Sequence, residues 1–427
     1  MSAARKSIQA KPRPIPARTL FMVPAAASLL AGLNAALFLL DLPAPLNAAH
    51  WSEVHGMVLA LGFVGTLVAL ERAVALGRRA GYLSPLLLGV GSLLLLSNVP
   101  RYAGKLGLLA GMAALVWVYL PLWRRQRDHA VLIQLLGAAL GTGAAILWLG
   151  GVEIALLLPW LAAFLVLSIA GERVELARIS MGPLAGTRAL QLSWLFTFAV
   201  AASLLNPAWG SVGFGLVLAV LVLWLAAHDV ARRTIRATGA TRFMATCMLT
   251  GYGWLLVAAI TWCFGFPATP AAYDTVIHAV FLGFTISMVI AHSSSILPAI
   301  LRRPLPYRPM MWAPATLLWA GLALRLWIGN GLGYEWAWRA GGAANVLALL
   351  LFLVLAVASV LMGEPRPKTV APAPPAAEPP GPGRGKSLLA PKSLGIGPPD
   401  VARALPDTNP AAQPPRSGLP ITLRKPE

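Results

Sequence analysis

The chain alternates between long apolar runs and short polar segments over most of its length. A helix needs roughly 20 apolar residues to cross a hydrocarbon layer about 30 Å thick, and twelve runs approach or exceed that length. They span residues 19–40, 54–76, 82–99, 103–123, 130–150, 152–170, 187–205, 208–228, 243–264, 272–297, 310–330 and 337–362. The pattern predicts an all-α, polytopic integral membrane helix bundle of twelve spans.

The composition agrees with this prediction and excludes a soluble enzyme. Hydrophobic residues make up 58% of the 427 residues and charged residues only 11%, whereas about 25% are charged in ordinary soluble domains. The net charge of +19 does not indicate nucleic-acid binding, because the basic residues lie in short loops between apolar runs. We therefore expect the lipid bilayer as a partner and no nucleic acid.

The basic residues also predict an orientation. If the basic tail, residues 1–18, lies in the cytoplasm, twelve crossings place five basic loops on that same side. These loops contain Arg78, Arg79, Arg124, Arg125, Arg127, Arg173, Arg178, Arg188, Arg232, Arg233, Arg236, Arg242, Arg302, Arg303 and Arg308. The opposite side receives only Arg101, Lys105 and Arg339. We therefore expect both termini in the cytoplasm and the bundle in a bacterial inner (cytoplasmic) membrane.

The chain divides into three parts by composition. Residues 19–363 form the expected transmembrane bundle, whose first run is too long for a signal-peptide core and is expected to stay as a helix. Residues 364–427 are rich in Pro, Ala and Gly. Such a segment cannot bury enough apolar surface to offset its chain entropy, so we expect a disordered cytoplasmic tail.

Two histidines are the first candidates for function, because ionisable residues within apolar spans usually face a partner, a cavity or a cofactor. His55 begins the second run and His278 lies in the first turns of the tenth. Both helices are expected to run from outside to inside, which places both imidazoles at similar depth near the outer surface. Such a pair suits the axial positions of a haem, or a copper ion with His50 as a third ligand. Hydrogen-bonded packing is the alternative.

A second group of polar residues is expected near the cytoplasmic ends of the helices. This inner polar cluster contains Glu71, Arg72, Glu172, Arg173, Glu175, Arg178 and His292. Glu175 and Arg178 can pair because they lie three residues apart on one helix. Glu71 and Arg72 are adjacent, so we expect their partners elsewhere, with Arg173 and Glu172 as candidates. The cluster either locks helix ends together, relays protons or anions, or holds haem propionates.

Two further expectations concern the ends and the interior of the later helices. The segment 171–178 is expected to follow the sixth helix, and Pro298 to break or kink the end of the tenth. Arg325 lies inside the eleventh run, toward its outer end. It can extend to the interface, pair with Asp274 or Glu335, or hold the carboxylate of a cofactor near His278.

The second and tenth helices resemble those of the NnrS family. The resemblance rests on His55-Gly56-Met57 with Gly62-Phe63, and on His278 with Gly283-Phe284. That family consists of twelve-helix bacterial membrane proteins that contain haem and copper and are linked to nitric oxide. The resemblance implies that His55 and His278 bind haem b, copper or both. The chain departs from the family pattern at Glu71-Arg72, at 171–173 and around His292, as a distinct subgroup would.

From these observations and the resemblance, we expect a membrane protein that binds haem or copper and acts in the response to nitric oxide or in electron transfer. A protein with that function would bind a small gas ligand or a redox partner. A secondary transporter that uses the inner polar cluster is the alternative from another class, and a scaffold without chemistry is a third. The sequence contains no recognisable nucleophile motif, phosphate-binding loop or His-His pair. It therefore assigns no enzyme activity, and it leaves the oligomeric state open.

Overall fold

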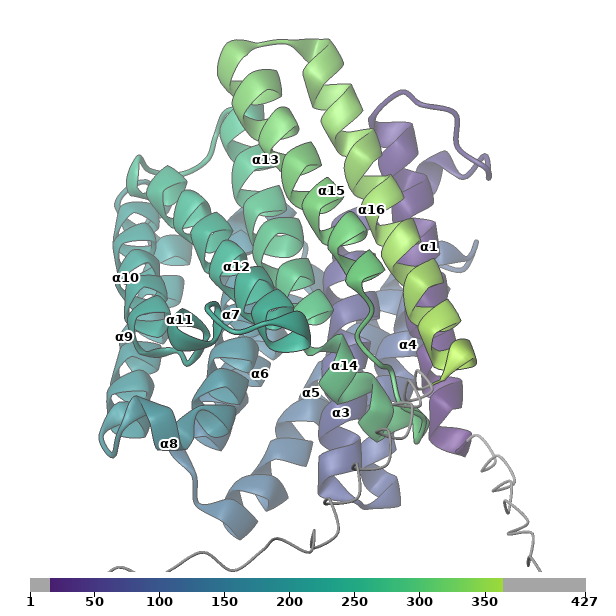
Figure 1. Ribbon diagram of the computed structural model, residues 1–427. Helices are drawn as coiled ribbons and strands as arrows, with labels where there is room; N and C mark the ends of the chain where they lie inside the picture. Colours follow the sequence, from purple (N-terminus) through teal and green to yellow (C-terminus); the bar gives the residue numbers. More distant parts are fainter. Residues whose placement is uncertain (1–15, 364–427) are drawn as a thin grey trace, which may run out of the picture. The chain divides into compact units, whose positions relative to one another are not determined.

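The computed structural model describes residues 16–363, apart from the side chains of residues 178 and 179. Helices make up all the regular structure of the described residues, which contain no strand (Figure 1). This confirms the predicted all-α class. Most of the basic N-terminal tail and the expected disordered segment 364–427 lie outside the described residues.

Within residues 16–363, twelve helical segments are long and apolar enough to cross a membrane, as the hydropathy pattern predicts. They are Ala17–Leu39, His55–Leu76, Arg79–Leu96, Arg101–Gln126, His129–Leu149, Ile154–Leu176, Ala185–Leu205, Pro207–His228, Gly239–Cys263, Pro270–Leu301, Pro309–Asn330 and Glu335–Met362. Apart from the C-terminal end of the sixth, these bounds agree with the predicted spans to within four residues.

The α-helices within these segments are bounded as follows. They are α1 (Met22–Leu39), α2 (His55–Met57), α3 (Thr66–Leu76), α4 (Leu83–Leu96), α5 (Arg101–Gln126), α6 (His129–Leu149), α7 (Ile154–Leu176), α8 (Arg178–Met181), α9 (Ala185–Leu205), α10 (Pro207–His228), α11 (Ala231–Thr234), α12 (Gly239–Cys263), α13 (Pro270–His278), α14 (Ser287–Leu301), α15 (Trp312–Ala323) and α16 (Glu335–Met362). Short 3₁₀ helices are η1 (Ala17–Phe21), η2 (Ala49–Trp51), η4 (Arg79–Tyr82) and η6 (Pro309–Met311).

Three of the spans in the described part of the chain contain a stretch of π-helix, the wide helix with i→i+5 hydrogen bonds. These stretches are η3 (Val58–Gly65), η5 (Ala279–Ile286) and η7 (Leu324–Asn330). The first follows His55 closely, the second begins directly after His278, and the third contains Arg325. Because π-helices are rare and often occur at functional sites, they draw attention to these three residues.

Two helix ends differ from the sequence prediction. Helix α7 continues to Leu176, so Glu172, Arg173 and Glu175 lie in its last two turns and not beyond it. Helix α14 continues through Pro298 to Leu301 and ends where Arg302 adopts a left-handed backbone with φ 54°. Pro298 therefore does not break the helix, and a kink at this residue stays a prediction.

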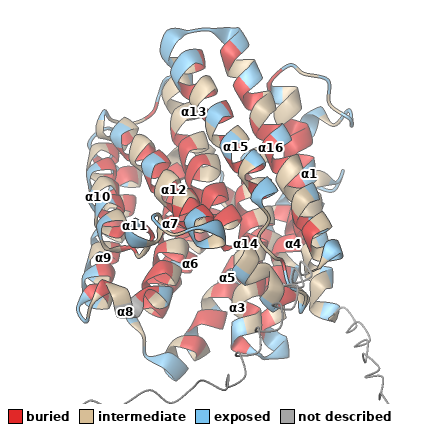
Figure 2. Ribbon diagram, viewed as in Figure 1, coloured by how far each residue is buried: buried red, intermediate tan, exposed pale blue. Residues whose placement is uncertain are grey.

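Helices that are neighbours in the sequence pack as pairs, because short loops join them. Helix α4 packs against α5, α6 against α7, α9 against α10 and α15 against α16. The π-helices pack against helices of other spans: η3 against α1, η5 against α12, and η7 against α16 and α13. Buried residues concentrate where the helices face one another (Figure 2).

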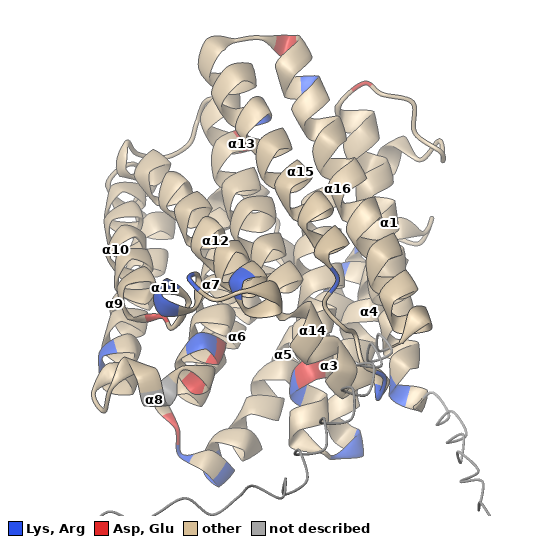
Figure 3. Cartoon of the chain, viewed as in Figure 1, with Lys and Arg blue, Asp and Glu red and all other residues tan. Residues whose placement is uncertain are grey.

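Charged residues lie mostly toward the ends of the helices, which leaves the middle of the helices largely uncharged (Figure 3). Within the described residues, Arg173, Asp229 and Arg325 are the charged residues that are buried. Arg325 lies near His55 and His278, whereas Arg173 and Asp229 form a separate ion pair at the C-terminal ends of α7 and α10.

Candidate functional site

A cavity of about 410 Å³ lies among α1, α2, η3, α7, α13, η5, η7 and α16. We call it the histidine cavity, because His55 and His278 both line it. Its other ionisable lining residues are Glu53, Asp274, Arg325 and Tyr273, and most of the remaining wall is apolar. The structure thus brings together the two histidines that the sequence singled out.

The His55 ring is oriented by the backbone of α1. Its Nδ1 lies 2.9 Å from the carbonyl oxygen of Gly32. Because a carbonyl oxygen only accepts hydrogen bonds, Nδ1 carries the ring proton and is the hydrogen-bond donor. No hydrogen bond of Nε2 is found among the described residues, so in the neutral ring this atom has a free lone pair.

The His278 ring is held in the same way by the preceding turn of its own helix. Its Nδ1 lies 2.9 Å from the carbonyl oxygen of Asp274 and 3.0 Å from the carboxylate Oδ1 of that residue. Nδ1 is therefore again the protonated nitrogen. In the described part of the chain Nε2 of His278 also makes no hydrogen bond, so both rings of the cavity have this nitrogen available to a ligand.

Asp274 receives four further hydrogen bonds, which fix its position. Arg325 donates through Nε to Oδ2 at 3.0 Å and through Nη2 to Oδ1 at 2.6 Å. Asn330 and Trp338 donate to Oδ2 at 2.8 and 3.2 Å. Pairing with Asp274 is one of the roles that the sequence left open for Arg325, and the pair holds the carboxylate that contacts His278. Metal-binding histidines commonly have such a partner on the nitrogen that does not bind the metal.

His50 lies apart from the two cavity histidines. It is exposed, its Nε2 is 3.4 Å from the carbonyl oxygen of Leu96, and it does not line the cavity. Within the described residues no group of three or more His, Cys, Asp or Glu side chains is placed to hold a metal ion. The three-histidine copper site considered from the sequence is therefore not formed by His50, His55 and His278 in this structure.

The glycines near the histidines have different surroundings. A Cβ atom added at Gly62 would lie 2.7 Å from Cβ of Ser92, and one added at Gly283 would lie 2.5 Å from Cβ of Trp254. These two glycines therefore allow helices to pack closely. Gly56 lines the cavity, and a Cβ atom there would meet nothing within 4 Å. The open space next to His55 is thus at Gly56.

The inner polar cluster separates into two networks. In the first, Arg72 pairs with the adjacent Glu71 and also donates to Gln134 at 3.0 Å and Glu175 at 3.4 Å. We expected the partners of Glu71 and Arg72 elsewhere because the two residues are adjacent, and this was wrong for Glu71, since the long arginine side chain returns to the preceding carboxylate. The predicted partners, Arg173 and Glu172, do not take part. The network instead joins α3, α6 and α7.

The second network centres on Asp229, which the sequence analysis missed. Arg173 donates to both of its carboxylate oxygens at 2.9 Å, and the Tyr252 hydroxyl donates to Oδ2 at 2.8 Å. Nη1 of Arg173 donates to Nε2 of His292 at 3.1 Å, and Nδ1 of His292 donates to the carbonyl oxygen of Met288 at 2.8 Å. Burial acts to raise the pKa of Asp229, but the hydrogen bonds and charge of Arg173 outweigh it, so the pKa lies below its ordinary value.

One predicted contact of the inner cluster falls outside what the structure describes. The side chain of Arg178 is not among the described residues, so its pairing with Glu175 stays a prediction. Among the described residues Glu172 forms no ion pair. The polar residues of α7 are therefore divided between the networks, with Glu175 in the first and Arg173 in the second.

The family model described as "Domain of unknown function (DUF8744)" matches residues 18–361. The chain belongs to this family. The DUF8744 match begins in the first span and ends in the last, so the histidine cavity and both inner networks lie within the DUF8744 region. No curated protein matches the chain.

Proposed function

We propose that the protein is a multi-pass protein of the bacterial inner membrane that binds haem b in the histidine cavity. In this proposal His55 and His278 bind the iron through Nε2, and both termini lie in the cytoplasm. Twelve apolar helices and the basic loops between them support the membrane location and the orientation. One observation carries the cofactor proposal: two imidazoles line one cavity, and each has its Nδ1 hydrogen-bonded to a main-chain carbonyl oxygen.

The residues of the cavity fit a haem in three respects. Two neutral imidazoles are a standard axial pair for haem iron. The wall is mostly apolar and includes Phe63 and Phe281, and about 410 Å³ lies in the usual range for cofactor sites. The open space at Gly56 allows a flat group to approach the backbone next to His55. Arg325 also lines the cavity, where it can interact with a carboxylate of the cofactor in addition to Asp274.

A bound haem supplies one-electron redox chemistry. The chain's own residues would set the conditions for it: Gly32 and Asp274 fix which nitrogen of each ring faces the cavity, and the apolar wall excludes water. If both histidines bound the iron, no ligand position would remain open for a small gas, so this pair would favour electron transfer with a redox partner. A role in the response to nitric oxide is supported only by the resemblance to the NnrS family.

Copper is supported less well than haem. Two imidazoles alone supply fewer ligands than copper sites in proteins usually have, and the described residues offer no group of three ligands that includes them. We therefore propose haem b as the cofactor and treat copper as an outcome that the experiment must distinguish.

The proposal is tested by absorption spectroscopy and metal analysis of the purified protein. The chain is expressed with added haem, purified in detergent, and examined for a Soret band and for haem b by the pyridine haemochrome assay. We expect the band in the wild type and its loss in His55→Ala and in His278→Ala. His50→Ala is the matched control, because it removes an exposed histidine outside the cavity, and it should retain the band.

A secondary transporter is the second candidate function, and the cavity itself favours it. A largely apolar cavity with a partly buried Arg325–Asp274 ion pair inside a bundle of apolar helices is also a suitable site for a small organic solute. A transporter would be purified without colour and without metal. Solute uptake into vesicles that is lost in Asp274→Asn, in a protein free of haem, would favour transport over electron transfer.

A further inference from the structure

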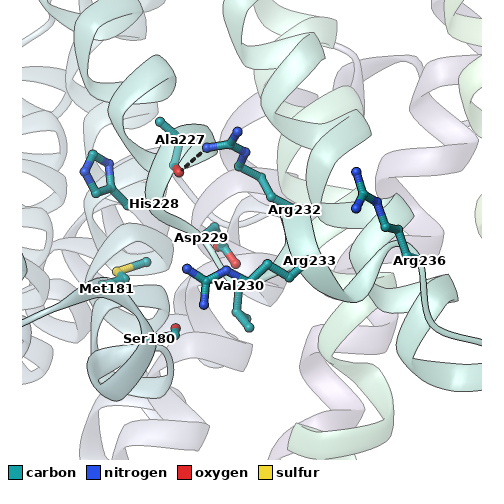
Figure 4. Close-up of a pocket in the computed structure, with 9 residues that line it drawn as sticks. All are labelled: Ser180, Met181, Ala227, His228, Asp229, Val230, Arg232, Arg233 and Arg236. Atoms are coloured by element: carbon teal, nitrogen blue, oxygen red, sulfur yellow. Dashed lines mark hydrogen bonds between the residues drawn. The ribbon is translucent and has the colours of Figure 1, made fainter.

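A second cavity, of about 580 Å³, lies at the ends of α8, α10 and α11, away from the histidines (Figure 4). We call it the arginine cavity. It is lined by Ser180, Met181, Ala227, His228, Asp229, Val230, Arg232, Arg233 and Arg236. Three arginines on five consecutive positions therefore surround one space.

The arginines of this cavity have little to neutralise them. Arg232 donates to the carbonyl oxygen of Ala227 at 2.7 Å, which is an uncharged partner. Arg233 and Arg236 make no hydrogen bond or ion pair among the described residues. All three are exposed. Their guanidinium groups are therefore free to bind an anion from outside the protein.

Among the described residues that line the arginine cavity, Asp229 is the one acidic residue, and Arg173 already balances its charge. Its Oδ1 accepts from Nη2 of Arg173 and from the backbone N–H of Ala231, and its Oδ2 accepts from Nε of Arg173 and from the Tyr252 hydroxyl. In Figure 4 the Arg233 side chain is directed toward Asp229, but both oxygens already have two donors. The net charge of the wall thus remains positive.

We propose that the arginine cavity binds a phosphate-bearing anion, either the headgroup of an anionic phospholipid or free phosphate. The planar guanidinium group matches phosphate oxygens with two parallel hydrogen bonds. Basic pockets between transmembrane helices on the cytoplasmic side are typical sites for phospholipid headgroups, and the loop with these arginines is predicted to lie on that side. This proposal does not depend on haem binding.

The test measures binding to the full-length protein in zwitterionic phosphatidylcholine nanodiscs. Phosphatidylglycerol is added in one series and inorganic phosphate in another, and binding is followed by the midpoint of thermal unfolding and, for lipid, by native mass spectrometry. Arg233→Gln combined with Arg236→Gln should weaken binding about thirtyfold, from the typical contribution of each basic residue near a membrane surface. Lysines at both positions keep the charge and should weaken binding less.

The matched control is Arg78→Gln combined with Arg79→Gln. These adjacent arginines are also exposed and predicted to be cytoplasmic, but they do not line the cavity, so binding should be unchanged. A response to phosphatidylglycerol alone identifies a lipid site, and a response to both probes identifies a phosphate site. If the wild type binds neither probe, or if the glutamine and lysine variants both bind as the wild type does, the proposal is overturned.

Discussion

Replacing Asp229 with alanine removes the centre of the second inner network. The carboxylate accepts two hydrogen bonds from Arg173, one from Tyr252 and one from the Ala231 backbone. Without it, the Arg173 guanidinium stays buried with one remaining hydrogen bond, to His292. The substitution therefore tests whether this ion pair fastens the loop after α10 to α7.

The expected cost follows from the burial of the pair. The side chain of Arg173 is 5% exposed and that of Asp229 is 0% exposed, so water screens neither charge. Removing one partner of such a pair costs about 3–5 kcal/mol, because the other charge is left uncompensated. Replacing both residues with leucine leaves no unpaired charge, so the double variant should recover much of that loss.

The measurement is the free energy of unfolding in mixed micelles, obtained by SDS titration and tryptophan fluorescence. Asp41→Asn is the control, because it removes a carboxylate from a pair with Arg339 in which the two side chains are 76% and 38% exposed. Asp41 has a left-handed backbone with φ 53°, a conformation that asparagine also adopts, so no measurable change is expected. If Asp229→Ala costs no more than this control, our account of the inner network is wrong.

Two further predictions concern the cavity and pH. Gly56→Leu should leave the unfolding temperature unchanged but abolish haem binding, because its side chain enters open space in the cavity. Gly283→Ala should instead lower the unfolding temperature, because its Cβ would clash with Trp254. Full haem binding by Gly56→Leu would argue against the site. Because the folded-state pKa of Asp229 is lowered, its stabilisation is complete above the ordinary pKa and is lost only as pH falls through the folded-state value. The wild type should therefore exceed Asp229→Ala in unfolding free energy by the same amount at about pH 8 and about pH 5, and this difference should shrink only below about pH 4. A decrease in the difference already between pH 8 and pH 6 would contradict this prediction.

Hydropathy predicts the twelve helices because only long apolar runs are stable in lipid, and the run lengths therefore define the spans. It also predicts a similar depth for His55 and His278, for a simple reason. Both residues lie in the first turns of spans expected to run in the same direction, so their depths match. The sequence could not show that Gly32 and Asp274 orient the two rings, because these contacts depend on how the helices pack.

Three features were missed, each for its own physical reason. Asp229 follows α10 in a basic loop and looks like a solvated surface residue, yet the loop turns inward and buries it against Arg173. Gln134 is uncharged and gives no signal in a search for ionisable residues. The π-helices change hydrogen-bond spacing over only seven or eight residues, so the hydrophobic pattern does not reveal them.

The central claim is that His55 and His278 bind one haem between them, and the ratio of haem to protein tests it most directly. We predict about one haem b per chain in the wild type and in His50→Ala, and none in His55→Ala or His278→Ala. A wild-type protein that stays free of haem when haem is supplied in excess, or a haem content that neither cavity substitution changes, would contradict the account.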